Sequence, residues 1–197
     1  MTCGAKPDML LWLDVETTAL DPTRGQLLEV GMAVTGMDGE TPDDVDDRLI
    51  RTWVIEHDAI RLCPDTAWAV DVHTRNGLVG ETFGDDAVGA YTAAKQVNGV
   101  LTDWAGKYTL HPAGTNVDFD IKWIRSRLEL HLDMLHYRKL DLTALRFLMR
   151  QVTLGAYFEP STDHRVTTCL KRDIQEYKHI LDKITALADL RDPRKGA

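Results

Sequence analysis

The sequence predicts an α/β or α+β fold, with strands in the first part of the chain and helices mixed with strands after Pro64. Two observations lead to this prediction. Apolar runs of strand length, rich in Val and Leu, precede residue 57, and apolar residues at helical spacing recur from about residue 86 onward. Strands first, followed by strands mixed with helices, are typical of these two classes.

Three strands are expected before the first helix, and together they predict hairpins in the first part of the chain. The acidic stretch TPDDVDD lies between the second and third strands and is expected to be a solvated loop. A turn signal, Asp38-Gly39, follows the second strand. The expected strands are 10–15, 27–35 and 48–56.

Helical spacing dominates the second part of the chain, where one further strand is expected at 108–111. The last helix is the longest, and we expect it to cover one face of the sheet. The expected helices are 65–70, 86–104, a helix from about Asp118, 140–152 and 165–190.

Length and composition predict one globular domain over residues 1–197, with a core of about 8–190 and ragged termini. The chain is 44% hydrophobic and 27% charged, and no apolar run approaches the roughly 18 residues of a membrane span. No signal-peptide pattern is present, and Cys3, Cys63 and Cys169 are too scattered for a disulfide framework. We therefore expect a cytoplasmic protein that does not bind membranes.

The formal net charge of −8 argues against a protein that follows long nucleic acids through a basic groove. Short oligonucleotides stay possible, because they offer few phosphates and because bound metal ions would cancel part of the negative charge.

Asp14 and Glu16 are the first candidate metal ligands. They are two residues apart in a predicted strand, so both side chains point to one face while Leu13 and Val15 point to the other. Burying two like charges side by side is costly unless a cation shares the site, and a hard divalent ion suits carboxylates best. Chance or surface salt bridges are the alternative explanation for such a pair.

Two further residues extend this hypothesis. Asp120 lies near the start of a helix that follows a Gly and Asn loop, where its carboxylate can face an open cleft. Asp118 is the competing choice, with helix capping as its alternative role. His164 precedes the last helix and is a candidate general base, although a structural histidine is the alternative.

The order of four segments resembles a known family. These are DVETTALD (14–21), GTNVDFDIKWI (114–124), HYRKLDLTAL (136–145) and DHRV (163–166). In this order they are similar to the DEDDh 3′ to 5′ exonucleases, and WAVDVHTRNGLV (68–79) and HYRKLDL are similar to stretches distinctive of the oligoribonuclease branch. The resemblance runs from Leu10 to about Ile180 and implies a ribonuclease H-like fold, a mixed central sheet flanked by helices.

The resemblance also implies a reaction. Two divalent cations, Mg²⁺ or Mn²⁺, would bind at Asp14, Glu16 and Asp120, activate a water and stabilise the leaving 3′ oxygen. His164 would take the proton from that water. The implied substrate is short single-stranded RNA, or DNA 3′ ends, and the products are 5′-mononucleotides.

Substrate-binding residues are carried over from the family to matching positions. Leu20 would wedge against the terminal bases, and Trp68 and His73 would supply stacking and sugar contacts. A second set would cap the 5′ phosphate of a dinucleotide or reach across a two-fold homodimer. For Trp68 and Tyr137, core packing is the alternative. The capping residues are Asn116, which replaces a serine, Arg138 and Thr143, and the dimer residue is Tyr137.

One departure from the family affects the metal site. Cys169 stands where the family pattern requires an aspartate, and a thiol is a weak ligand for Mg²⁺ unless the working metal is softer. Asp173 lies one turn further along, and we predict that it supplies the fourth carboxylate, directly or through a metal-bound water, with the last helix starting late or sliding by a turn. The weak helix formers at 166–168 favour such a late start. A solvated aspartate paired with Lys or Arg is the alternative.

Three functional hypotheses remain at this stage. The first is an exonuclease acting on very short RNA. The second is an exonuclease of the same fold that prefers DNA or longer 3′ ends. The third is a catalytically weakened or silent nucleotide-binding module, which Cys169 keeps open. The predicted substrate pocket favours the first.

Overall fold

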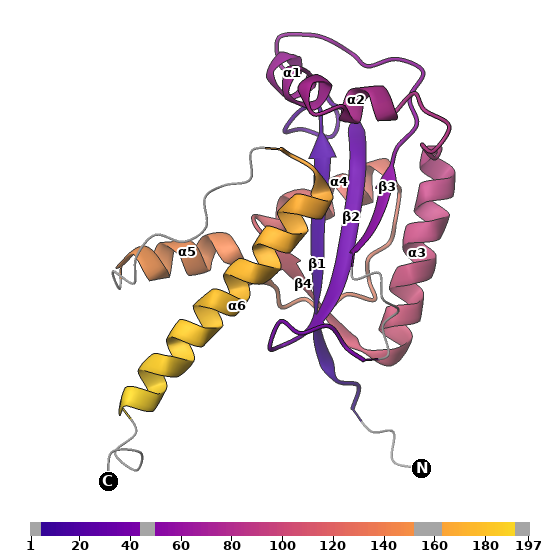
Figure 1. The fold of residues 1–197 in the computed structure, drawn as a ribbon. Coiled ribbons are helices and arrows are strands. Elements are labelled where there is room, and N and C mark those ends of the chain that lie inside the picture. Colours follow the sequence, from indigo (N-terminus) through magenta and orange to yellow (C-terminus); the bar gives the residue numbers. More distant parts are fainter. Residues whose placement is uncertain (1–4, 44–49, 152–162, 192–197) are drawn as a thin grey trace.

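The computed structural model describes residues 5–43, 50–151 and 163–191, so part of the expected acidic loop lies outside the described residues. A five-stranded mixed sheet, in the order β3-β2-β1-β4-β5, forms the centre of the fold (Figure 1). The first three strands pair antiparallel, and β4 and β5 continue the sheet in parallel. The strands are β1 (Asp8–Thr17), β2 (Leu27–Gly36), β3 (Ile50–Val54), β4 (Thr109–Gly114) and β5 (Leu140–Asp141).

Helices pack on both faces of the sheet, which confirms the α/β prediction (Figure 1). Buried side chains of α3 and α4 pack with Leu11, Leu13 and Val15 of β1 on one face. On the other face, α5 and α6 pack with Leu10 and Trp12. The helices are α1 (Ala67–Arg75), α2 (Leu78–Glu81), α3 (Ala90–Lys107), α4 (Val117–Arg127), α5 (Leu142–Gln151) and α6 (Val166–Arg191).

As expected from the period-2 pattern of β1, Asp14 and Glu16 lie on the same face of the sheet. Because side chains alternate along a strand, Asp14 and Glu16 share the face of Leu10 and Trp12, which is the face that α6 covers. The pairing of β1 with β2 shifts register after Glu16, so the strand changes its local geometry where the carboxylates end.

Several element boundaries differ from the predicted ones. The first helix begins at Ala67 because the Thr66 hydroxyl accepts a hydrogen bond from Cys63 N and donates to Arg61 O, which fixes a turn there. The helix expected from residue 86 begins at Ala90, since Val88 is still bonded to the end of β3. The two-residue strand β5 was not predicted, because it is too short to show a period.

Gly31 of β2 allows α6 to lie close to the sheet. Gly31 pairs with Asp14, and a Cβ atom at this position would be 2.9 Å from Val166 Cβ and 3.0 Å from Leu170 Cδ1. Such distances are too short for real Cβ contacts, so only glycine fits without displacing the helix. The expectation that the last helix covers one sheet face is confirmed, whereas the expected late start is wrong, because α6 begins at Val166.

Within the described residues, no helix combines the length and the apolar character that crossing a membrane requires.

Candidate metal and active site

Three carboxylates meet near the carboxyl end of β1. Asp14 and Glu16 come from the strand itself, and Asp120 comes from the first turn of α4. Asp120 is buried and its Oδ1 accepts a hydrogen bond of 3.0 Å from Val15 N, which ties α4 to the strand between the two other acids. Asp118 is exposed and pairs with Lys139, so Asp120 rather than Asp118 belongs to this cluster.

Among the described residues, the charges of Arg172 and Arg165 act on these carboxylates but do not outweigh burial and mutual repulsion. Burial, followed by repulsion from Asp120, Glu16 and Asp173, raises the pKa of Asp14 well above its usual value. Burial and the nearby Glu29 raise the pKa of Glu16 to about 8, and burial likewise raises that of Asp120. Because crowded buried carboxylates are stabilised by a shared cation, these shifts are those expected of a cation site.

An unsatisfied atom supports the same conclusion. Asp14 Oδ2 is buried and has no hydrogen-bond partner among the described residues. One ligand atom each from Asp14, Glu16 and Cys169 lie within 4.8 Å of one another. Atoms this close together can contact a single ion, so the residues present fit a divalent metal.

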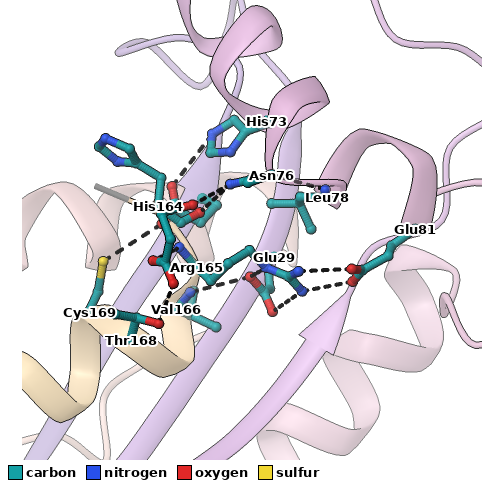
Figure 2. Close-up of polar contacts among 12 residues, drawn as sticks. Glu29, His73, Asn76, Leu78, Glu81, His164, Arg165, Val166, Thr168 and Cys169 are labelled. Atoms are coloured by element: carbon teal, nitrogen blue, oxygen red, sulfur yellow. Dashed lines mark hydrogen bonds and ion pairs between the residues drawn. The ribbon is translucent and has the colours of Figure 1, made fainter. Parts of the chain in front are cut away.

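Cys169 faces the carboxylates from the first part of α6. Its Sγ donates a weak hydrogen bond of 3.9 Å to Glu16 Oε1 (Figure 2). Burial, followed by the charges of Asp14 and Glu16, raises the pKa of the thiol. In the metal-free protein Cys169 is therefore a protonated, buried thiol, placed where the sequence comparison with the family calls for a carboxylate.

Asp173 is also buried close by, but other groups hold both of its oxygens. Its Oδ2 accepts hydrogen bonds from Thr115 N (3.0 Å) and Thr115 Oγ1 (2.9 Å). Its Oδ1 accepts two from the Arg172 guanidinium, and Arg146 lies 3.6 Å away. The structure thus gives Asp173 hydrogen-bond partners of its own, and its role as a metal ligand stays a prediction.

His164 lies beside the cluster, in a backbone conformation that is unusual for a residue with a Cβ. Its φ is 47°, in the left-handed region, and its ring is 5.8 Å from the Trp68 ring and 6.4 Å from the His73 ring, centroid to centroid. The Asn76 side-chain amide donates to the backbone oxygens of Asp163 and His164 (Figure 2). Asn76 therefore holds the turn that presents the histidine.

The next residue anchors the same turn from the other side. Arg165 donates to both oxygens of buried Glu29, at 3.0 and 3.2 Å, and to both oxygens of Glu81, at 2.8 and 2.7 Å (Figure 2). These carboxylates raise the pKa of the guanidinium. The sequence analysis missed Asn76, Arg165, Glu29 and Glu81, which hold this turn. The one available signal was the Asn-Gly pair after α1, which marks a turn at Asn76.

His73 is a buried residue of the site. Its Nε2 lies 3.5 Å from Glu16 Oε2, and burial followed by the neighbouring His164 lowers its pKa to about 4. At neutral pH the ring is uncharged and packs against the Glu16 carboxyl group. The predicted contact of His73 with a sugar stays a prediction.

A groove of about 220 Å³ opens beside these residues. Leu20 and Trp68 are 83% and 69% exposed at its edge, so the alternative of core packing is wrong for Trp68. An exposed leucine and tryptophan next to a carboxylate cluster suit the flat faces of nucleobases. The groove is lined by Val15, Glu16, Thr17, Thr18, Ala19, Leu20, Asp65, Trp68, Ala69, His73, Phe119 and His164.

Two of the predicted phosphate-capping residues, Asn116 and Thr143, donate to the same carboxylate. Asp141 Oδ1 accepts hydrogen bonds from Asn116 N (3.2 Å) and Thr143 N (2.8 Å), so Asp141, which was not predicted, brings these two residues together. Arg138 lies over the Tyr137 ring, 5.2 Å from its centroid. Tyr137 is 74% exposed, which makes the core-packing alternative wrong for it as well.

The chain is similar in sequence to curated oligoribonucleases. No protein-family profile matches the chain. The oligoribonuclease of Haemophilus ducreyi is 24% identical over 184 residues, which are 91% of this chain and 96% of that protein. The oligoribonuclease of Actinobacillus pleuropneumoniae is 27% identical over 176 residues, 86% of this chain and 90% of that protein.

Among solved structures, Escherichia coli exonuclease I in complex with a dT13 oligonucleotide superposes with a TM-score of 0.67 at 13% identity. The match covers 93% of this chain but only 43% of exonuclease I, so the chain spans less than half of that protein. The likeness confirms the ribonuclease H-like exonuclease fold.

Proposed function

We propose that the protein is a metal-dependent 3′ to 5′ exonuclease that hydrolyses short oligoribonucleotides to 5′-mononucleotides. The observation that carries the proposal is the buried carboxylate cluster with its unpartnered Asp14 oxygen, at the edge of a groove with exposed Leu20 and Trp68. The oligoribonucleases that match almost their whole length to this chain support it further.

The residues divide the chemical work between them. Asp14, Glu16 and Asp120 would hold divalent ions, Mg²⁺ or Mn²⁺, which supply a polarised phosphate and an acidified water when bound. His164 would act as the general base that accepts a proton from the attacking water, a role that imidazole side chains commonly fill. Asn76 positions His164 by fixing its backbone oxygen.

The two ends of the substrate are bound by different groups. Trp68 stacks on a terminal base and Leu20 wedges against it, with about 1 to 3 kcal/mol per stacked base and no sequence preference. Arg138, Asn116 and Thr143 receive the 5′ phosphate of a dinucleotide. The net charge of −8 favours such short substrates, because a long strand would be repelled along its length.

We also propose that the enzyme is a cytoplasmic homodimer. Exposed Tyr137 supports a subunit contact next to the phosphate cap, and the free thiols of Cys63 and Cys169 fit a reducing compartment.

Turnover of a labelled diribonucleotide tests the proposal. The protein is incubated with Mn²⁺ or Mg²⁺ and either a diribonucleotide or a single-stranded DNA of ordinary length. We expect faster release of 5′-mononucleotides from the diribonucleotide. Faster degradation of the DNA would instead favour the second candidate, an exonuclease for DNA 3′ ends, which the DNA-bound exonuclease I structures keep open. No turnover of either substrate would leave a silent nucleotide-binding module.

Arg138→Ala tests the short-substrate assignment. Losing a charge-assisted hydrogen bond to the 5′ phosphate should cost about 1.5 to 3 kcal/mol, or about 10- to 100-fold in kcat/KM for a dinucleotide. Longer substrates, whose 5′ end lies beyond reach, should be affected much less. Lys139→Ala is the matched control, because it removes a neighbouring positive charge that is already paired with Asp118. Equal losses at all lengths would show that Arg138 is structural.

A further inference from the structure

We propose that Cys169 completes a metal site with Asp14 and Glu16 that binds a thiophilic divalent ion of the Zn²⁺ or Co²⁺ class. The inference rests on the proposed function, because it concerns the same carboxylates. It goes beyond that function by giving one ion position a different chemical preference from Mg²⁺.

The positions of the three side chains support a shared ion. Ligand atoms held tetrahedrally at about 2.0 to 2.3 Å from one ion lie about 3.3 to 3.8 Å apart. The atoms offered by Asp14, Glu16 and Cys169 lie within 4.8 Å of one another, and Cys169 Sγ is 3.9 Å from Glu16 Oε1. Side-chain rotations that close these distances by up to about 1 Å would therefore bring the three atoms to one ion.

An independent observation marks the open side of this site. Asp14 Oδ2 is buried and accepts no hydrogen bond from any described residue, so its lone pairs are available to an ion. In contrast, Asp173 accepts four hydrogen bonds from Thr115 and Arg172 and would have to give up some of them to bind metal. Direct ligation by Cys169 needs no such exchange.

Backbone packing holds the thiol in this position. α6 begins at Val166, and its first turns lie against Gly31, the strand neighbour of Asp14. Because Gly31 has no Cβ, the start of the helix packs directly on the sheet, and the same contacts place Cys169 beside the carboxylates.

The ligand types decide which ion is preferred. Thiolate selects Zn²⁺ and similar soft or borderline ions, whereas sites made only of oxygen suit Mg²⁺ and Mn²⁺. The thiol releases its proton to the solvent buffer when the ion binds, since the thiolate is the ligand form. The all-oxygen pair Asp14 and Asp120 stays available to a hard ion.

Co²⁺ binding to the full-length, metal-free protein tests the inference by absorption spectroscopy. Wild type should develop a near-ultraviolet thiolate-to-cobalt charge-transfer band. Cys169→Ser should lose the band and bind Co²⁺ about 10-fold or more weakly in calorimetry. Cys169→Asp should also lose the band while binding Mg²⁺ about 10-fold more tightly than wild type. The Cys3→Ser/Cys63→Ser double variant removes both other thiols and should keep the band.

Several results would overturn the inference. Co²⁺ binding without a charge-transfer band, a band that persists in Cys169→Ser, or no Co²⁺ binding at all would each exclude Cys169 as a ligand. Loss of Co²⁺ binding in Asp173→Asn with normal binding in Cys169→Ser would assign the position to Asp173. Circular dichroism of each variant establishes whether it is folded. If Cys169→Ser does not fold, Cys169→Asp serves as the variant without a thiol at this position.

The readout also separates the two proposals. A charge-transfer band without hydrolysis of the diribonucleotide supports the metal site and contradicts the exonuclease function. Mn²⁺-dependent hydrolysis without the band supports the function and contradicts the thiolate ligand.

Discussion

Asp14→Asn should lower turnover of a diribonucleotide by about 10³-fold while the fold stays intact. The carboxylate lies at the centre of the cluster, and losing about 4 kcal/mol of metal-based stabilisation of the transition state corresponds to that factor. The comparison uses initial rates at saturating Mn²⁺. Asp118→Asn is the matched control. Asp118 lies in the first turn of α4, as Asp120 does, but it is exposed and paired with Lys139. Normal turnover in Asp14→Asn would contradict the proposed metal site.

The same variant should change how stability depends on pH in the metal-free protein. The pKa of Asp14 is raised in the folded state, so as the pH rises above about 4 the unfolded chain ionises first and the folded state loses relative stability. Glu16, with a pKa of about 8, extends this loss toward pH 8. Melting temperatures without metal should therefore fall from about pH 5 to about pH 8 in wild type, and fall less in Asp14→Asn.

Arg165→Met should destabilise the protein by about 3 to 5 kcal/mol, because it leaves the Glu29 carboxylate buried without its partner. Urea unfolding of the metal-free protein measures the change. Glu81→Gln is the control, since Glu81 is about half exposed and its half of the ion pair should contribute about 1 kcal/mol or less.

A double variant separates the cost of leaving the Glu29 charge unpaired from the loss of the ion pair itself. Glu29→Gln combined with Arg165→Met removes the unpaired charge, so it should recover part of the stability lost in Arg165→Met. A single Arg165→Met variant within about 1 kcal/mol of wild type would show that Glu29 is solvated rather than buried. Turnover should fall in Arg165→Met as well, because the turn that carries His164 loses one of its two anchors.

The sequence was sufficient for the features that depend on local pattern. The period of β1 placed Asp14 and Glu16 on one face, and the Gly and Asn loop before α4 directed attention to Asp120. Each of these predictions rests on a local rule, either strand alternation or the start of a helix.

The remaining features depend on contacts between distant residues, which no local pattern reveals. Arg165 and Glu29 are 136 residues apart. The sequence pattern around Glu29 predicts only a strand and gives no sign of its ion pair. The hydrogen bonds of Asp173 with Thr115 likewise span 58 residues. The family resemblance identified Cys169 as a departure, but local reasoning had no means of deciding what surrounds Asp173.

The chain positions of the proposed metal ligands also determine when that site can first form during synthesis. Glu16 and Cys169 are 153 residues apart, and Val15 and Asp120 are 105 apart. A chain that grows from its amino end thus carries its first two carboxylates long before the thiol exists. Since a metal site is rarely preformed in an unfolded chain, the proposed site with Cys169 is complete only when α6 docks on β1 and β2. Binding of an ion at that site would therefore be coupled to a contact between distant parts of the chain, and the ion would stabilise chains that have made it.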